Sequence, residues 1–333
     1  RAKAWYFAGE ILAMDPPPAW LKSTELATYN VAGNTYPSFT PILALWSAMA
    51  LGGWSETLIN LPVMCCGIAL GLGMYGQARD QGLPTWAALL AAYLLLSIPL
   101  VGAHLSLAGQ ADIWMTGFAG LGFIAILRGL IQSQNFQLLL GLGIVAMGIA
   151  TKVEGGVWFV AALLVVAMVK LPRATLLSLL SIALLCLAGW ATGVVYLEIP
   201  LLGGLGIRQD MLHIPLLGSY GLQDFDLLDD YLDNFLGSGT WHLLWSMLLL
   251  AVGAIVTTAR SKLGYALLTF YAVTLAAQVL IFDGTAIGKW AEDWTAINRL
   301  PLHFAPALMF SVLMLITHWR LPDQAISLLQ SLK

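Results

Sequence analysis

Charge is scarce in this sequence. Only 10% of the 333 residues are charged, against about a quarter in a typical soluble domain, whereas 59% are hydrophobic and the mean hydropathy is +0.82. This composition excludes a water-soluble globular enzyme, and the 13 Trp and 12 Phe residues exclude a disordered chain. We therefore predict an all-α fold, in which residues 1–333 form one integral membrane domain built as a polytopic bundle of transmembrane helices.

Several chemical motifs are also absent. The chain has no run of basic residues and a net charge of −3, which excludes nucleic acid as a partner. Its three cysteines lack the spacing of a metal or redox motif. The glycines of residues 67–76 include a GxGxxG match, but no strand precedes them, so they indicate close packing of helices. The chain starts at Arg1 without a signal-peptide layout, and we expect further sequence upstream.

Long apolar runs predict about nine membrane spans, since a helix must cross about 30 Å of hydrocarbon at about 1.5 Å per residue. Residues 1–54 form the first outer loop, in which residues 38–53 read as an interfacial helix, and residues 197–240 form a large outer loop. The predicted spans are residues 55–76, 84–102, 112–131, 136–150, 156–170, 174–196, 241–260, 263–282 and 300–318.

The short connections between these spans carry most of the positive charge. On one side they and the C-terminal tail hold eight of the fifteen Lys and Arg residues but only two of the eighteen acids. By the positive-inside rule this side faces the cytoplasm, so the long loops lie outside. We expect a functional site on that outer side rather than a pore used from both faces.

Five ionisable residues stand at the outer ends of the predicted spans. Asp112 opens a span, either as a helix N-cap or as a carboxylate at the lip of a cleft. Lys152 and Glu154 lie in a hinge between two short apolar segments, where they form either an exposed ion pair or a functional pair below the surface. Arg299 and His303 lie one turn apart on the last span, and Arg299 at a helix start requires an anion.

Five aspartates crowd residues 224–233 of the large outer loop. An EF-hand loop starting there would need glycine at Asp229 and glutamate at Phe235, and it has neither. We interpret the segment as a solvated acidic loop that frames an outer cleft.

The spaced motifs together resemble a known family. They cover nearly the whole chain. Their order and spacing are similar to those of the bacterial branch of the GT-C glycosyltransferases, such as the protein mannosyltransferases and the aminoarabinose transferases, and the chain resembles glycosyltransferase family 39. The matching segments are Arg1-Ala-Lys-Ala-Trp-Tyr, Tyr36-Pro37 with Pro41, Ala111-Asp112, Thr151-Lys152-Val-Glu154-Gly155, and Asn298-Arg299-Leu-Pro-Leu-His303.

This resemblance implies an enzyme of the bacterial inner membrane that works on the periplasmic side. Such an enzyme moves a sugar from a polyprenyl-phosphate donor to a hydroxyl of a protein, lipid or glycan acceptor, among the lipids of the membrane. The family's catalytic acid follows its first span, so we expect the base upstream of Arg1, with Glu10 as a weaker candidate. Asp112 corresponds to the second acidic residue, which orients a substrate or holds a divalent metal; no other cofactor is implied.

The remaining roles follow from the chemistry of that reaction. The leaving phosphate gains negative charge, and a fixed cation stabilises it; Lys152 and Arg299 are the candidates. Glu154 is expected to position Lys152, with His303 beside the substrate. Tyr36 and Trp294 either stack on a sugar ring or belong to the aromatic belt of the membrane interface.

Two other classes of function compete with this interpretation. A secondary transporter or lipid flippase would need ionisable groups near the middle of the bilayer and access from both faces, and the spans hold essentially none. A non-catalytic membrane scaffold would lack the catalytic acid altogether.

Overall fold

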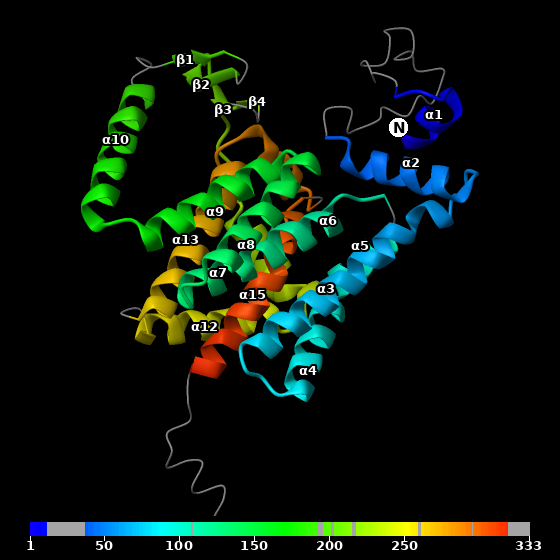
Figure 1. Ribbon diagram of the computed structural model, residues 1–333. Helices are drawn as coiled ribbons and strands as arrows, with labels where there is room; N and C mark the ends of the chain where they lie inside the picture. Colours follow the sequence, from blue (N-terminus) through cyan, green and yellow to red (C-terminus); the bar gives the residue numbers. More distant parts are fainter. Residues whose placement is uncertain are drawn as a thin grey trace, which may run out of the picture.

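The computed structural model describes residues 1–11, 37–107, 109–191, 196–200, 203–214, 218–258, 261–294 and 296–318. The fold is mostly helical, as predicted (Figure 1). The first half contains α1 (Ala2–Ala8), α2 (Phe39–Leu51), η2 (Leu58–Asn60), α3 (Leu61–Asp80), α4 (Thr85–Leu96), α5 (Pro99–Ser106), α6 (Asp112–Thr116), η3 (Gly117–Leu121), α7 (Gly122–Ile131), α8 (Asn135–Met147), η4 (Gly148–Ala150) and α9 (Glu154–Lys170).

The second half begins with α10 (Arg173–Ala191) and continues through a small sheet to the C-terminal helices. The strands are β1 (Tyr196–Ile199), β2 (Gly203–Arg208), β3 (Met211–Ile214) and β4 (Gly218–Gly221). The helices after the sheet are α11 (Leu228–Leu232), η5 (Asp233–Gly237), η6 (Gly239–Trp241), α12 (Leu244–Thr258), α13 (Lys262–Phe282), η7 (Ala286–Gly288), α14 (Lys289–Glu292) and α15 (Arg299–His318).

Three helical segments of the described residues are long and apolar enough to cross a membrane: Leu58–Asp80, Asp112–Ile131 and Lys262–Phe282. They match three of the nine predicted spans. Other predicted spans are helical but shorter, such as α8, whose 13 residues extend about 20 Å. The chain is therefore helical and carries candidate membrane spans, while the number nine stays a prediction.

The predicted span 84–102 is broken in the structure. Helices α4 and α5 meet at a bend of 65°. Ile98 has ψ 121° and precedes Pro99, which disfavours the helical conformation in the residue before it. The X-Pro step thus ends α4, and α5 starts in a new direction.

An antiparallel sheet in the large outer loop departs from the predicted all-α fold. Its strands follow one another in the order β1-β2-β3-β4. Gln209 and Asp210 both have positive φ between β2 and β3, as the two central residues of a type I′ hairpin turn do. Because neither turn residue is glycine, the usual hairpin signal is absent from the sequence.

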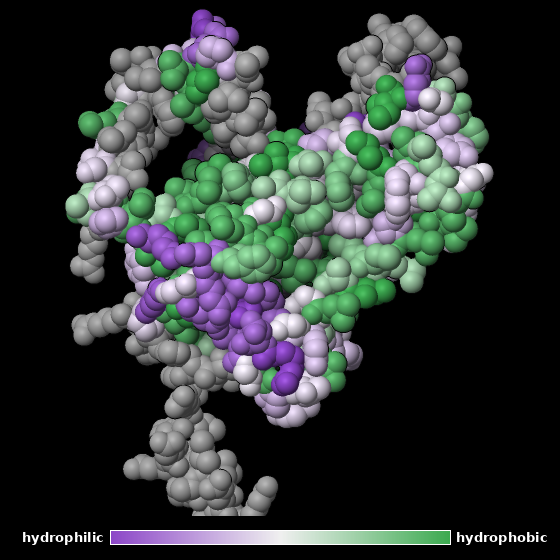
Figure 2. All heavy atoms as spheres, viewed as in Figure 1, coloured by the Kyte–Doolittle hydropathy of each residue, from purple (hydrophilic) through white to green (hydrophobic). Residues whose placement is uncertain are grey.

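Three of the short connections predicted to share one side lie together, namely those after α3, α7 and α12. Arg128 of α7 is buried and donates to Asp80 at the end of α3, and Lys262 at the start of α13 donates to Ser133 in the α7–α8 turn (Nζ–Oγ 2.6 Å). Figure 2 shows a hydrophilic patch near the end of α7 that extends towards the α3–α4 turn, on a face that is otherwise largely apolar.

Helix α15 lies at the centre of the bundle, and residues 300–308 of it are buried. Gly120 of η3 allows its close approach, because a Cβ atom at Gly120 would lie 2.5 Å from Cγ of Pro306. A second close contact joins η4 and α9, where a Cβ atom at Gly155 would overlap the carbonyl group of Gly148. The N-terminal ends of α6, α9 and α15 meet through Asp112, which accepts hydrogen bonds from Lys152 and Arg299.

Candidate functional site

The carboxylate of Asp112 is the centre of a buried charged cluster. Its side chain is fully buried, and it accepts hydrogen bonds on both oxygens. Oδ1 accepts from Lys152 Nζ at 2.9 Å and from His303 Nε2 at 3.1 Å. Oδ2 accepts from Arg299, through Nη2 at 2.7 Å and Nε at 3.2 Å. Four predicted site residues thus meet, although up to 191 positions separate them in the sequence.

This geometry corrects two expectations about Asp112. Asp112 is the first residue of α6 rather than its N-cap, which is Ala111, and no side chain caps the helix. Nor does Asp112 stand at the lip of a cleft, because none of its surface is exposed. The two cations and the imidazole explain why a carboxylate can be buried here, since buried charges require charged or hydrogen-bonded partners.

A hydrogen bond from Trp158 fixes the protonation of His303. The indole Nε1 of Trp158 lies 2.9 Å from Nδ1 of His303, and an indole nitrogen can only donate. Nδ1 is therefore the acceptor, and the ring proton is on Nε2, which donates to Asp112. His303 is neutral in this arrangement and extends the hydrogen-bond chain from Trp158 to the carboxylate.

Lys152 connects Asp112 to a second carboxylate. Its Nζ lies 3.3 Å from Oε1 of Glu154, as expected if Glu154 positions it. Lys152 is buried, so the exposed ion pair considered above is wrong. Burial acts to lower the pKa of Lys152, but the negative charges of Glu154 and Asp112 outweigh it and hold that pKa above its ordinary value. The ammonium group is therefore charged at neutral pH.

Two members of the cluster reach solvent. The side chain of Arg299 is 39% exposed and that of Glu154 is 23% exposed, whereas Asp112 and His303 are fully buried. Arg299 also has its predicted anion, which is Asp112. The cluster therefore has a closed inner part and an accessible edge formed by one cation and one carboxylate.

Arg128, Asp112 and His303 lie near the ends of predicted spans, and all three are buried among the helices.

Other predicted site residues lie outside this cluster. Glu10 is exposed beyond the end of α1, and Tyr36 falls outside the described residues. Trp294 is 46% exposed, and its Nε1 donates to Asp230 Oδ1 at 2.7 Å, in the acidic part of the outer loop. Among the described residues, no group of three or more His, Cys, Asp or Glu side chains could hold a metal ion. A divalent ion on Asp112 would have to displace one of its present donors.

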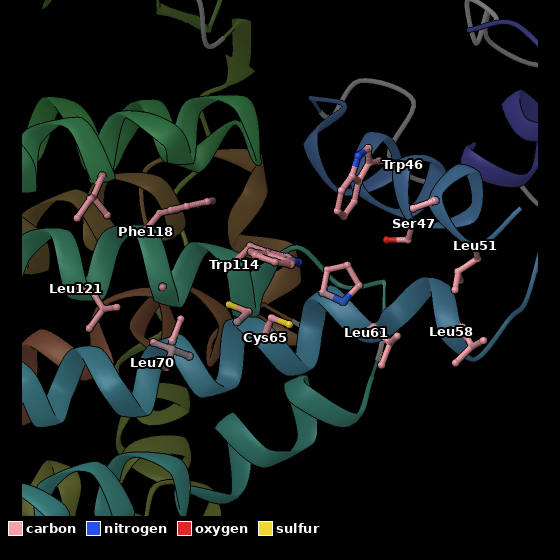
Figure 3. Close-up of a pocket in the computed structure, with 16 residues that line it drawn as sticks. Trp46, Ser47, Leu51, Leu58, Leu61, Cys65, Leu70, Trp114, Phe118 and Leu121 are labelled. Atoms are coloured by element: carbon pink, nitrogen blue, oxygen red, sulfur yellow. The ribbon is translucent and has the colours of Figure 1, made fainter.

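An apolar groove lies beside α6, the helix that begins at Asp112 (Figure 3). Its volume is about 610 Å³, and it runs between α2, α3 and the α6–η3 segment. Trp114, two residues after Asp112, lies in its wall together with Phe118. Residues that line the groove include Trp46 and Leu51 of α2 and Leu61, Cys65 and Leu70 of α3.

Sequence reasoning missed three residues that support the site. Trp158 follows Glu154 by one helical turn, a spacing that places both on one face of α9. Asn298 directly precedes Arg299, and its Oδ1 accepts from Trp241 Nε1 at 2.8 Å. Nothing in the local sequence predicts that last contact, because the two residues are 57 positions apart.

Comparison with known proteins adds no family assignment. No family model matches the chain, and neither the curated proteins nor the solved structures give a match.

Proposed function

We propose that this chain is a membrane glycosyltransferase that moves a sugar from a polyprenyl-phosphate donor to an acceptor hydroxyl. The observation that carries the proposal is the Asp112 cluster, in which Lys152, from the turn before α9, and Arg299, at the start of α15, converge at one end of the bundle. A pair of fixed cations, one of them partly exposed, suits a ligand with a phosphate group. The resemblance of the spaced motifs to the GT-C family points to the same chemistry.

Arg299 is the residue that we assign to the phosphate. Its guanidinium is partly exposed and has the fork geometry that binds phosphate through two N–H groups. When it turns from Asp112 to a phosphate, Asp112 keeps hydrogen bonds from Lys152 and His303. The exchange therefore leaves no buried charge without a partner.

In the proposed reaction the acceptor oxygen attacks the sugar carbon bonded to the phosphate. The C–O bond to the phosphate breaks, and polyprenyl phosphate leaves with the bonding electron pair. A carboxylate takes the hydroxyl proton. Asp112 already accepts four hydrogen bonds, so Glu10 is the candidate for this step among the predicted catalytic residues of this chain. Arg299 pairs with the charge that develops on the phosphate, and Lys152 stabilises it at longer range from its place on Asp112.

The apolar groove suits the prenyl chain of such a donor. Its lining is almost wholly apolar, and Trp114 places it on the same short helix as Asp112. A lipid whose phosphate lies at Arg299 would thus have a hydrocarbon-binding surface nearby. The distribution of Lys and Arg supports an orientation with the cluster on the outer side of the membrane. The resemblance to the GT-C family makes that side the periplasm and the membrane a bacterial inner membrane.

The direct test is sugar transfer by the full-length protein in proteoliposomes, with a panel of radiolabelled polyprenyl-phosphate sugars and membrane acceptors. We expect Arg299→Ala and Lys152→Ala to lose at least about 100-fold in rate, the scale for removing one charge-stabilising donor. Lys289→Ala is the matched control, since Lys289 is an exposed cation of α14 outside the cluster. The purified variants must also remain folded at the assay temperature, because Lys152→Ala removes a partner of the buried Asp112 and should lower the melting temperature.

Absence of transfer from every donor by the folded wild-type protein would contradict the proposal. The same proteoliposomes then serve to measure the movement of labelled polyprenyl phosphate between leaflets. Such movement would favour the transporter or flippase, which the buried ionisable groups also allow, and its absence would favour the scaffold.

A further inference from the structure

Two hydrogen bonds join the turn before Arg299 to α11 and η6. Trp294 Nε1 donates to Asp230 Oδ1 of α11 at 2.7 Å, and Trp241 Nε1 of η6 donates to Asn298 Oδ1 at 2.8 Å. Trp294 has φ 63°, a conformation that non-glycine residues seldom adopt and that surrounding contacts must hold. The start of α15 is therefore placed by contacts from outside the helix.

The indole of Trp241 is the more rigid of these two attachments. Its side chain is fully buried and packs edge-on against Trp245, with ring centroids 5.5 Å apart and planes at 78°. Phe235 contacts both tryptophans and stacks on Trp245 at 4.2 Å. Held in this aromatic cluster, the Trp241 N–H has one direction in which to donate.

Asn298 transfers that constraint to the cluster around Asp112. Its side chain accepts from Trp241, and its backbone carbonyl accepts from the N–H of Leu302 at 3.2 Å in the first turn of α15. Arg299 is the next residue, and its long side chain must reach Asp112 from this point. A shift in the first turn of α15 would therefore move the guanidinium relative to the carboxylate.

We propose that Trp241 and Asn298 are positioning residues, which fix the first turn of α15 and so hold the guanidinium of Arg299 on Asp112. The aromatic cluster of the outer region thereby sets the geometry of the cation that reaches solvent. The positioning itself does not depend on the reaction, but its effect on a bound phosphate rests on the proposed function.

Two tryptophan-to-phenylalanine variants separate this role from simple packing. Trp241→Phe removes the N–H donor and keeps an aromatic ring. Trp245→Phe is the matched control, because the Trp245 Nε1 is buried without a hydrogen-bond partner among the described residues. Both variants lose part of an indole in the same cluster, but only the first loses a hydrogen bond to Asn298.

The measurement is the rate at which phenylglyoxal modifies Arg299 in the purified full-length protein, followed by peptide mass spectrometry. Loss of one neutral hydrogen bond should raise that rate about two- to tenfold in Trp241→Phe. The rate in Trp245→Phe should equal that of the wild type. Arg79, which donates to the carbonyl of Leu83 in the α3–α4 turn, is the internal control and should react equally in all samples.

Asn298 provides an independent pair of variants in case Trp241→Phe does not fold. Asn298→Asp retains an acceptor oxygen for the indole and should keep the wild-type rate, whereas Asn298→Leu should show the same increase as Trp241→Phe. Equal Arg299 reactivity in Asn298→Leu and Asn298→Asp, or in the two tryptophan variants, would overturn the proposal.

Transfer kinetics distinguish this failure from failure of the proposed function. If both proposals hold, Trp241→Phe raises KM for the lipid-phosphate donor by a similar factor, with a smaller change in kcat. Altered Arg299 reactivity in a protein that transfers no sugar would support the positioning role and contradict the glycosyltransferase. Unchanged Arg299 reactivity in a variant of a protein that does transfer sugar would support the glycosyltransferase and contradict the positioning role.

Discussion

Replacing Asp112 with asparagine tests whether the buried cluster has the energetics that its geometry implies. The substitution keeps the shape of the side chain but removes the negative charge that Lys152, Arg299 and His303 share. Removing one partner of a buried ion pair costs about 3–5 kcal/mol, because the other charge stays buried. The introduced amide would also place an NH₂ group against one of these donors.

The expected loss of unfolding free energy in Asp112→Asn lies near the lower end of that range. Arg299 is 39% exposed and can turn to water, so its share is small. Lys152 is only 4% exposed but keeps Glu154 at 3.3 Å. We therefore expect Asp112→Asn to lower the free energy of unfolding by about 3 kcal/mol. Glu154→Gln, which changes a partly exposed pair, should lower it by less than about 1 kcal/mol.

The assay is reversible unfolding in mixed micelles with increasing SDS, followed by tryptophan fluorescence. A double variant, Asp112→Asn with Lys152→Met, removes both charges and should recover part of the loss, because a pair replaced on both sides leaves no orphaned charge. Equal unfolding free energies for Asp112→Asn and Glu154→Gln would refute the reasoning, as would a double variant no more stable than the sum of the two single changes predicts.

Two further predictions concern Gly155 in the hinge and Asp283 at the end of α13. Gly155→Ala should destabilise the protein by about 1–3 kcal/mol, because the new Cβ would overlap the carbonyl of Gly148. Gly143→Ala is the control and should be neutral or stabilising, because no atom lies within 4 Å of its new Cβ. Thermal denaturation of the two variants compares their stabilities. Burial, with added repulsion from Asp224, raises the pKa of Asp283. The folded state then binds the proton more tightly than the unfolded state, so the stability of the wild type falls as pH rises above about 4. The melting temperature of Asp283→Asn should therefore exceed that of the wild type at pH 7 but match it at pH 3.

The residues of the cluster could be predicted because charge is rare in this chain. In a sequence this apolar, Asp112, Lys152 and Arg299 stand out at the ends of hydrophobic runs, and burial of such groups is costly unless they are paired. Their pairing could not be predicted, since Asp112 and Arg299 are 187 positions apart. The sequence therefore indicated that Arg299 needs an anion without showing that Asp112 supplies it.

The structure departs from the predicted fold at residues 84–102 and in the small sheet, and each departure has a local cause. Apolar runs predict helices well, but the length of a run does not show where a helix breaks, as the Ile98-Pro99 step does within residues 84–102. The outer sheet was missed because its strands have four to six residues and its β2–β3 turn uses Gln209 and Asp210 instead of Asn-Gly. In both cases the backbone conformation of one or two residues decides the structure, and hydropathy does not report it.

The charge balance of the Asp112 cluster favours binding of one kind of phosphate ester over another. Asp112 and Glu154 supply two negative charges, Lys152 and Arg299 supply two positive charges, and His303 is neutral, so the cluster has no surplus cation. A phosphate monoester carries close to two negative charges at neutral pH and would draw both cations away from Asp112, leaving a buried carboxylate poorly compensated. A sugar phosphodiester carries one charge, which Arg299 can pair with while Lys152 stays on Asp112. The proposed donor is such a diester and the leaving group is a monoester, so this balance favours binding of the donor and release of the lipid product.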